Sequence, residues 1–331
     1  MQSDIQSQMS QSQMSQSQMS QSQMPGSQAP HTSNPKPGTM KAAVYKENGI
    51  ITLEHRPVPA LADPQDAIIR VTLTTICSSD IHIKHGAVPR AMPGTILGHE
   101  FVGIVEQTGE AVKKFKQGDR VAVNVETFCG ECYFCRRGYV NNCTHEHGGW
   151  ALGCRIDGGQ AEYVRVPFAD NGLTEIPDEV TDEAALFTGD ILSTGYWGAS
   201  LAEIKPADTV AVIGAGPTGL CTLMCARLYG PGVVIAIDTS DERLKLAKEQ
   251  GLADVIINPL KQDVEQEIKK LTLGRGADAV LEVAGGRDTF RMAWKIARPN
   301  AVVCVVALYE EPQMIPLPDM YGKNLVFKTG G

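Results

Sequence analysis

The chain has 331 residues, of which 43% are hydrophobic and 21% are charged, and its formal net charge is −8. This length is sufficient for two domains with cores of their own. No basic face of the kind that binds nucleic acid is visible, and no apolar run reaches the roughly 18 residues that cross a bilayer. The N-terminus lacks the regions of a secretory signal, so we expect a cytoplasmic protein with reduced thiols.

Residues 6–20 repeat Gln-Ser-Gln-Met-Ser three times, residues 21–25 read Gln-Ser-Gln-Met-Pro, and the stretch up to Thr39 adds Pro, Gly, Ser and Asn. Segments of this composition bury too little apolar surface to fold, and Gln and Ser leave no amphipathic helical face. We therefore predict a disordered low-complexity tail over residues 1–39 and folded sequence from Met40 onward.

Residues 40–187 contain short apolar segments broken by Gly, Asp and Pro. The first two segments, 41–45 and 51–55, flank Asn48-Gly49, which is a strong signal for a β-hairpin turn. Further strands are predicted at 67–76, 101–109, 120–126 and 161–167. This pattern predicts a β-rich, barrel-like domain with inserted loops.

In residues 188–331, apolar strands alternate with helices. The predicted strands are 209–216, 233–238, 254–258, 279–285, 301–308 and 325–331. The predicted helices include residues 241–250, a helix through Val264, Ile268 and Leu271, and a helix that carries Phe290, Trp294 and Ala297. This alternation predicts an α/β domain with a doubly wound parallel sheet.

Three glycines, Gly214, Gly216 and Gly219, follow a predicted strand and open a helix. In this context the G-x-G-x-x-G spacing indicates a dinucleotide site, because the turn, the approach of a pyrophosphate and the helix packing each require glycine. The helix N-terminus then presents free N–H groups to the phosphates. Asp238 ends the next strand, where a carboxylate accepts bonds from ribose hydroxyls and favours NAD over NADP. Arg243, nearby, complicates this preference.

Four cysteines lie close together in a polar loop over residues 128–144. They are Cys129, Cys132, Cys135 and Cys143. Disulfides are disfavoured by the expected compartment, and an iron–sulfur motif would place its fourth cysteine earlier and before a proline. Free core cysteines do not suit so polar a loop. We interpret the segment as a lobe that holds structural zinc.

Cys77, His99 and Asp190 are dispersed, and spacing alone does not bring them together. A cysteine after a strand is usually core, and an aspartate before a helix can be a cap. The segment from Gly98 to Val112, however, fits the pattern G-H-E-x2-G-x5-G-x2-V. With the four-cysteine lobe and the glycine motif in the same order, the chain resembles the zinc-dependent, medium-chain alcohol dehydrogenases from Met40 to Gly331. Their β-rich catalytic domain resembles the GroES fold, and their second domain is a Rossmann domain.

The resemblance implies two zinc ions per chain and a nicotinamide cofactor. It assigns the catalytic zinc to Cys77, His99 and Asp190, in the branch of the family with aspartate as third ligand, and Glu100 to a transient ligand. Three protein ligands leave zinc one open position for a substrate oxygen.

Four further residues receive roles from the resemblance. Ser79 takes the substrate proton and His82 passes it toward solvent. Asp80 orients the zinc-bound histidine, and Thr194 lies near the nicotinamide.

The expected reaction is reversible hydride transfer between a small primary or secondary alcohol and NAD. A polyol, threonine or formaldehyde dehydrogenase on the same scaffold is an alternative. A zinc-free quinone reductase is disfavoured by the three ligands.

The family continues beyond the sixth strand with a segment that returns to the β-rich domain. This chain is therefore expected to be C-terminally truncated, which leaves open a non-catalytic zinc- and NAD-binding fragment. Family members are commonly homodimers or homotetramers.

Other chemistry-bearing residues are predicted to be structural. Cys221 and Cys225 lie one helical turn apart and are expected to pack as small hydrophobes, like Cys304 in its strand, while Cys154 lies in a loop and does not read as a ligand. His145 and His147 are expected at the surface. Trp150 and Trp197 are expected in packing, with a substrate pocket as the alternative.

Overall fold

The structure is a computed structural model that describes residues 38–47 and 49–331. The predicted disordered tail falls almost wholly on residues outside these ranges. The first strand, β1 (Thr39–Tyr45), begins one residue before the predicted start of folded sequence. Within the described ranges, every helix is too short or too polar to cross a membrane.

The first two strands form the hairpin that the Asn-Gly pair predicts. β1 pairs antiparallel with β2 (Ile51–Pro57), so that Tyr45 lies opposite Ile51. Asn48 itself lies outside the described residues. Met40, Ala42 and Val44 alternate along β1 and are buried together with Ile96, so the period-2 pattern of the sequence sets the buried face.

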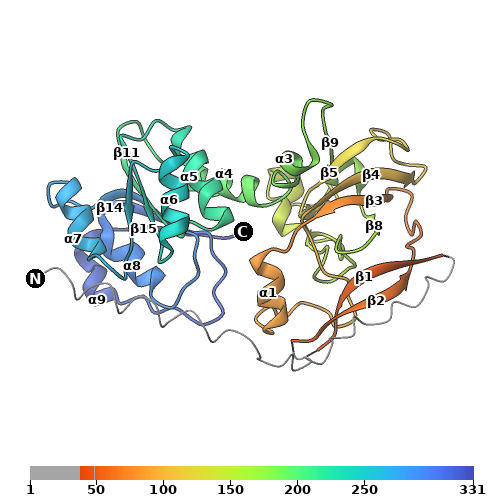
Figure 1. The fold of residues 1–331 in the computed structure, drawn as a ribbon, viewed down its shortest axis with the longest axis horizontal. Coiled ribbons are helices and arrows are strands. Elements are labelled where there is room, and N and C mark those ends of the chain that lie inside the picture. The colour runs from red at the N-terminus through yellow and green to blue at the C-terminus, as the bar shows by residue number, and fades with distance from the viewer. Residues whose placement is uncertain (1–37, 48) are drawn as a thin grey trace, which may run out of the picture. The chain divides into compact units, whose positions relative to one another are not determined.

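A five-stranded antiparallel sheet forms the centre of the β-rich part (Figure 1). Its order is β8 (Tyr163–Val166), β3 (Ala67–Thr74), β4 (Phe101–Thr108), β5 (Arg120–Val123) and β9 (Leu173–Glu175). Apolar side chains of β3, β4, β5 and β8 pack into one core on one face. Four of the predicted strands are confirmed. The short strands β6 (Glu126–Thr127), β7 (Gly149–Trp150) and β9 are too brief to give a sequence pattern.

Helices in this part are short and lie in the connections. They are α1 (Ser78–Lys84), α2 (Ala169–Gly172) and α3 (Asp182–Leu186), with 3-10 turns η1 (Cys135–Arg137) and η2 (Val140–Asn142). Thr181 caps α3, since its hydroxyl accepts a bond from the N–H of Ala184.

A six-stranded sheet, parallel throughout, forms the C-terminal part and confirms the doubly wound prediction. Its order is β12 (Val255–Ile257), β11 (Val233–Ile237), β10 (Thr209–Ile213), β13 (Ala277–Glu282), β14 (Ala297–Val305) and β15 (Val326–Thr329). The strand order reverses on either side of β10. A ligand crevice is expected at the carboxyl end of such a strand.

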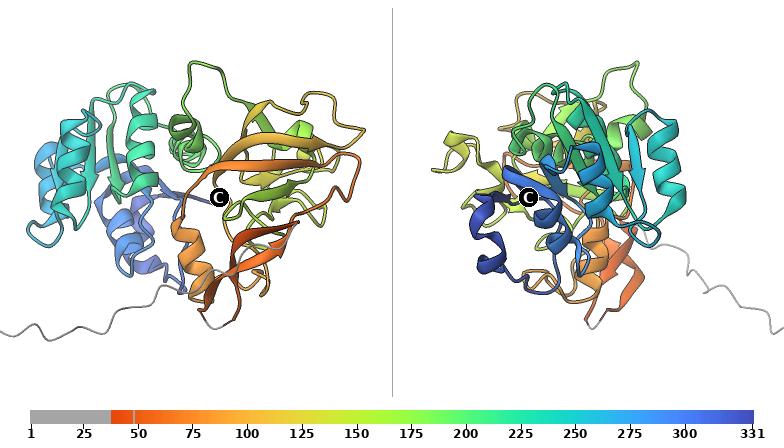
Figure 2. Two further views of the ribbon diagram at one scale, coloured as in Figure 1. Left: turned by 45° about the vertical axis from the view of Figure 1, so that its right-hand side comes forward. Right: turned by 90° about the vertical axis from the view of Figure 1, so that its left-hand side faces the viewer.

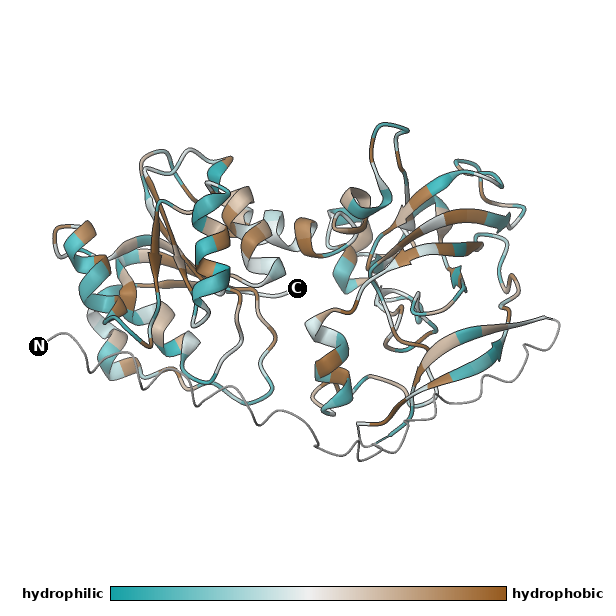
Figure 3. Ribbon diagram, viewed as in Figure 1, coloured by the Kyte–Doolittle hydropathy of each residue, from teal (hydrophilic) through white to brown (hydrophobic). Residues whose placement is uncertain are grey.

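Helices cover both faces of this sheet, as Figures 1 and 2 show. α4 (Ile191–Leu201), α5 (Pro217–Arg227) and α6 (Asp241–Glu249) supply residues to one core, and α7 (Val264–Leu271) and α8 (Thr289–Ile296) to the other. Neighbouring residues of β10 divide between the cores, with Val210 and Val212 in one and Ala211 and Ile213 in the other. The apolar strands of the sequence, coloured as hydrophobic in Figure 3, are therefore buried on both faces.

One detail of the helix prediction is wrong. Ala297 was expected in the helix with Phe290 and Trp294, but α8 ends at Ile296 and Ala297 begins β14. Pro299 explains the break, because the residue before a proline is disfavoured in helical conformation. β14 then bulges, since Ala277 pairs with Ala297 whereas Ala279 pairs with Val302.

Lys323 secures the segment between β14 and β15, where α9 (Leu317–Met320) and η3 (Tyr321–Lys323) lie. Its ammonium donates hydrogen bonds to the carbonyls of Trp294, Lys295 and Ala297, at 2.7–2.8 Å. These are carbonyls at the end of α8 that lack helical partners. Burial lowers the pKa of Lys323 from its ordinary value. The side chain thus caps α8 and holds η3 against it.

We expect Lys323→Met to lower the free energy of unfolding by about 1–3 kcal/mol, because partly buried carbonyls lose their donor. Denaturant titration followed by circular dichroism measures this. Lys245→Met, which removes an exposed lysine of α6, is the control and should change the value by less than about 0.5 kcal/mol. Equal effects of both substitutions would contradict the capping role.

Candidate active site and metal centres

The turn between β3 and α1 brings three of the expected site residues together. Cys77 is the N-cap residue of α1, and its N–H donates to Asp80 Oδ2 at 3.0 Å. The Cys77 Sγ lies 3.6 Å from the Ser79 hydroxyl. Asp80 is buried and also accepts a bond from Gln160 Nε2 at 2.9 Å. The capping interaction therefore fixes where the thiol points.

His99 is placed by a loop that depends on glycine. Gly98 has φ +94°, and a Cβ there would come within 2.6 Å of Gln160. Cβ atoms on Gly153 and Gly158 would come within 2.8 and 2.0 Å of the Gly98 backbone. Such close backbone approach is open only to glycine. The His99 side chain is 1% exposed, and its ring meets the Trp150 ring edge-on at 5.4 Å.

Asp190 occupies the N-cap position of α4, but its side chain makes no capping bond. Instead Oδ1 accepts a bond from the Thr194 hydroxyl at 2.8 Å, and Oδ2 lies 3.3 Å from His99 Nε2. Thr194 therefore braces the carboxylate toward the histidine. The helix-cap interpretation of Asp190 is correct for its position and wrong for its side chain.

The dispersed residues meet at one point. One potential ligand atom from each of Cys77, His99, Glu100 and Asp190 lies within 4.8 Å of all the others. Asp80 Oδ1 lies 3.6 Å from the other ring nitrogen of His99. Spacing alone could not place these residues together, and the family resemblance did.

Charge is concentrated in this cluster. Burial opposes a charge on His99, yet Asp190, Cys77 and Asp80 together raise its pKa well above the ordinary value. Burial and then the Asp190 charge raise the pKa of Glu100 to about 7. Burial likewise raises the pKa of Asp80. Several acidic groups and a thiol are packed around one imidazole, and a bound cation would offset the cost of burying their negative charges.

The donor set fits zinc. Thiolate, imidazole and carboxylate are the ligands of catalytic zinc sites. Glu100 Oε1 and His99 Nδ1 are buried and have no hydrogen-bond partner among the described residues. Asp80 lies where a carboxylate can orient a metal-bound histidine. Cys77, His99 and Asp190, with Glu100 adjacent, are the residues that would hold the ion.

His82 contacts a residue that the sequence did not suggest. Its Nδ1 lies 2.7 Å from Glu310 Oε1, and the same oxygen lies 3.3 Å from His85 Nδ1. The two histidines lower the pKa of Glu310. Glu310 follows β14 in a segment without a motif, so no sequence signal marks it. His82 is 22% exposed, which suits a group that exchanges protons with solvent.

A cleft of about 760 Å³ joins these groups. Cys77, Ser79, His82, His99 and Asp190 line it, with Thr194 of α4. Carboxyl ends of the parallel strands also contribute, through Val283, Val306 and Thr329 and their neighbours. Trp150 and Trp197 both line the cleft. Trp150 is also buried in a core with Ile83, Leu97 and Cys154, as the packing expectation says. His145, in contrast, is exposed, and His147 is half-buried.

The four cysteines of residues 128–144 form a second cluster. Their sulfurs lie within 4.8 Å of one another, with Cys132 and Cys135 at 3.4 Å and Cys129 and Cys143 at 3.6 Å. A disulfide would need about 2.05 Å, whereas thiolates around one zinc at about 2.3 Å each lie about 3.8 Å apart. The spacing fits a closed tetrahedral zinc site. All nine cysteines of the chain are free thiols.

The remaining cysteines take no part in these clusters. Cys225, Cys304 and Cys154 are buried, and Cys221 is half-buried in α5. The thiol of Cys304 has a pKa raised by burial to about 11. The prediction of core packing is confirmed for Cys225 and Cys304.

The glycine motif lies at the carboxyl end of β10. Gly214 has φ +104°, and a Cβ on Gly219 would come within 2.0 Å of the Gly214 carbonyl. A Cβ on Gly216, the N-cap residue of α5, would meet only Arg243 Nη1, at 3.7 Å. The first and third glycines thus serve the turn and helix packing, and the second leaves room for a phosphate.

Asp238 lies directly after β11 and braces this loop. Its Oδ2 accepts a bond from the Ala215 N–H at 2.7 Å, and Oδ1 accepts one from the Ser240 N–H at 2.8 Å. Arg243 lies 4.0 Å from Oδ2 and is exposed. Asp238 and Arg243 therefore lie next to each other beside the glycine loop.

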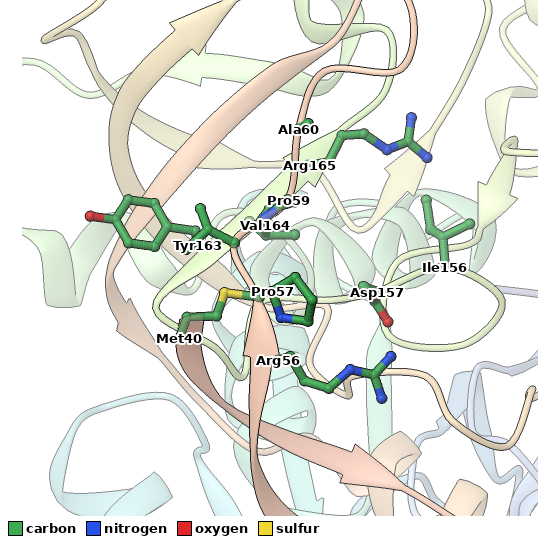
Figure 4. Close-up of a pocket in the computed structure, with 11 residues that line it drawn as sticks. Met40, Arg56, Pro57, Pro59, Ala60, Ile156, Asp157, Tyr163, Val164 and Arg165 are labelled. Atoms are coloured by element: carbon green, nitrogen blue, oxygen red, sulfur yellow. The ribbon is translucent and has the colours of Figure 1, made fainter. Parts of the chain in front are cut away.

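A separate hollow of about 400 Å³ lies along β2 and β8 (Figure 4). Its charged side chains are already engaged within the fold. Arg165 pairs with Asp66 at 3.0 Å, Arg56 donates to the Gly94 carbonyl at 3.2 Å, and Asp157 accepts from the Ile96 N–H at 2.9 Å. No chemistry points to a ligand there.

Comparisons with known proteins agree with this geometry. Residues 63–178 match the model of the alcohol dehydrogenase GroES-like domain, and residues 217–329 match that of the zinc-binding dehydrogenases. An alcohol dehydrogenase of Cupriavidus necator is 42% identical over 295 residues, which cover 84% of this chain and 79% of that protein. The chain belongs to the zinc-dependent alcohol dehydrogenases.

Two further comparisons extend this family assignment. An apo zinc-dependent alcohol dehydrogenase 2 from Streptococcus pneumonia superposes with a TM-score of 0.82 and 40% identity, covering 88% of this chain and 82% of that one. The NADP-dependent isopropanol dehydrogenase of Thermoanaerobacter brockii is 35% identical over 83% of this chain and 78% of its own length. The predicted GroES-like and Rossmann architecture and the use of zinc with a nicotinamide cofactor are thereby confirmed.

We expect the purified protein to contain about two zinc ions per chain, and His99→Ala and Cys135→Ser about one each, because each substitution removes a ligand of a different cluster. Inductively coupled plasma mass spectrometry measures the metal content. Cys221→Ser, outside both clusters, should keep both ions. Full zinc content in Cys135→Ser would show that the cysteine lobe holds no metal.

Proposed function

We propose that the chain transfers hydride reversibly between a small primary or secondary alcohol and NAD. The observation that carries this proposal is the convergence of Cys77, His99 and Asp190 in a cleft that also contains Ser79 and the carboxyl ends of the parallel strands. Zinc bound there acts as a Lewis acid toward the substrate oxygen. Family membership supports the same reaction.

The chain's own residues handle the proton in this scheme. The Ser79 hydroxyl, beside Cys77, accepts the proton of the substrate hydroxyl and at the same time releases its own proton toward His82, as hydride leaves. His82 then carries a proton between the cleft and solvent, and the contact with Glu310 orients its ring. Thr194 holds Asp190 in place and forms part of the wall where the nicotinamide is expected. Asp80 keeps His99 in the orientation for ligation.

NAD is the proposed cofactor, with NADP less favoured. A carboxylate at Asp238 accepts hydrogen bonds from ribose hydroxyls and repels a 2′-phosphate. The isopropanol dehydrogenase relative uses NADP, and Arg243 is close enough to meet a phosphate. Two backbone N–H groups hold the Asp238 carboxylate in place, whereas the Arg243 side chain is exposed. The fixed carboxylate therefore has the stronger influence on cofactor choice, which favours NAD.

Several coarser features complete the proposal. We place residues 40–187 in the catalytic domain and residues 188–331 in the cofactor domain, with residues 1–39 as a separate tail. Nine free thiols, five of them suited to zinc, support a cytoplasmic location. A homodimer or homotetramer is proposed, supported by the exposed apolar side chains Val326 and Phe327 of the edge strand β15.

We expect the protein to form NADH from ethanol, 2-propanol and other small alcohols, and Cys77→Ser to lose this activity because the metal loses a ligand. Ser79→Ala should lower kcat about a hundredfold, since general acid–base groups contribute on that order. Absorbance at the NADH band measures turnover, with Cys221→Ser as the control. Zinc and NADH binding without turnover of any alcohol, sorbitol, threonine or formaldehyde would favour a non-catalytic role.

Asp238→Gly should raise KM for NAD roughly tenfold, because hydrogen bonds to a charged acceptor are lost. The ratio of kcat/KM for NADP to that for NAD should rise as the repulsion disappears. Collapse of the glycine loop would lower kcat/KM for NAD and for NADP alike. Loss of the carboxylate's repulsion raises the ratio, so comparing the two cofactors within the variant separates the two causes. Glu242→Gln, on the exposed side of α6, serves as control, and an unchanged ratio in Asp238→Gly would contradict the role.

A further inference from the structure

Three side chains in the cleft have no part in the proposed chemistry. Arg90, Glu126 and Trp150 line the cleft beside the zinc ligands, and we call them the polar patch. Arg90 lies in the loop after α1, Glu126 begins β6, and Trp150 ends β7. Glu126 and Trp150 are partners in the antiparallel β6–β7 pair, so the two short strands hold them side by side.

Glu126 has unused hydrogen-bonding capacity. Its carboxyl makes no hydrogen bond or ion pair within the part of the chain that the structure describes, and its Oε2 is buried. Burial raises the pKa of Glu126 to about 7, opposed by the Arg90 charge and reinforced by that of Asp190. Buried carboxyl groups in proteins are ordinarily hydrogen-bonded. A ligand that brings a hydrogen-bond donor would therefore be favoured here.

Arg90 supplies the complementary charge. Its guanidinium lies over the Trp150 ring, 5.0 Å from the centroid, which is a cation–π arrangement. It forms no ion pair with a carboxylate among the described residues. One side of the guanidinium faces the Cys154 thiol, and the other N–H groups remain available as donors. The patch thus offers an acceptor and a donor near the same indole ring.

The patch adjoins the reacting centre. The Trp150 ring meets the ring of His99, one of the proposed zinc ligands, at 5.4 Å. The charges of Asp190 and His99 both act on Glu126. A substituent on the carbon next to the reacting carbinol would therefore lie against the patch, whereas a distant substituent would not.

A second hydroxyl suits this patch better than a charged group. A hydroxyl donates one hydrogen bond and accepts others, so it can serve Glu126 and Arg90 together. A carboxylate or phosphate on the substrate would bring a like charge against Glu126, and an ammonium would be repelled by Arg90. A plain hydrocarbon would leave the buried Glu126 Oε2 without a partner.

We propose that Arg90 and Glu126 select vicinal diols, and the corresponding hydroxyketones in the reverse direction, over monohydric alcohols. The inference rests on the proposed function, because it names the substrate class of the same site. The oxidation itself is the proposed one: the carbinol C–H leaves as hydride to NAD, the O–H proton leaves through Ser79, and the second hydroxyl is unchanged.

The test compares 2,3-butanediol with 2-butanol, which share a carbon skeleton. We expect wild-type kcat/KM to favour the diol, and Glu126→Leu to lower the diol-to-monoalcohol ratio by at least about tenfold, since polar sites discriminate strongly against substrates that leave them unpaired. Glu126→Gln, which keeps the shape, should lower the ratio less, and Arg90→Met should also lower it. Glu110→Gln, at an exposed position, should leave it unchanged. An unchanged ratio in Glu126→Leu would overturn the inference.

A binding measurement makes the test independent of turnover. Thermal midpoints of the zinc-loaded protein with NADH, recorded with added 2,3-butanediol or 2-butanol, should show greater protection by the diol, and Glu126→Leu should abolish the difference. Diol-selective binding without turnover would refute the proposed function but support diol selection by Arg90 and Glu126. If both alcohols are turned over in a Cys77-dependent way and neither assay shows a diol preference, the proposed function stands and diol selection by Arg90 and Glu126 is refuted.

Discussion

The site depends on one electrostatic constraint. An imidazole, a thiol and three carboxyl groups are packed around His99, at the wall of the cleft, and His99, Glu100 and Asp80 among them are buried. Such a group of charges is costly unless a cation joins it. The cap of α1, the glycine contacts of Gly98 and the start of α4 each deliver one side chain to this point. Metal affinity is therefore built from three connections between regular elements, and the sheets serve to hold those connections in place.

The loop that carries the second candidate metal cluster also lines the cleft. Within the cysteine lobe, Gly138 and the residues up to Asn142 line the cleft, as do residues at the carboxyl ends of the parallel strands. Asn141 also donates a hydrogen bond to the Gly331 carbonyl at 3.0 Å. If the lobe closes around zinc, the ion sets the position of a wall that substrates pass. A site described as structural would in this way influence substrate access.

The sequence predicted those features whose signal is local. The parallel sheet follows from its apolar strands, the cofactor loop from Gly214 to Gly219, and the lobe from four cysteines within one loop. Cys77, His99 and Asp190 are far apart in the chain, and only the family pattern joined them. Glu310 and Glu126 escaped prediction because their meaning comes from neighbours that are distant in sequence: His82 and His85 for one, and Arg90 and Trp150 for the other. Ala297 was placed in the helix because it continues the helical spacing of Phe290 and Trp294. Pro299 disfavours helical conformation in the residue before it, so the helix ends earlier.

The glycine contacts behind His99 have a consequence for altering this protein. Gly153 and Gly158 never reach the cleft, yet any side chain at either position would push against the backbone of Gly98. The tolerance of the metal site to change is thus limited by a segment that contributes no ligand and touches no substrate. A library meant to reshape the cleft can vary Arg90 and Glu126, but Trp150 packs against the histidine and residues 153–160 support its loop, so these should be kept unchanged.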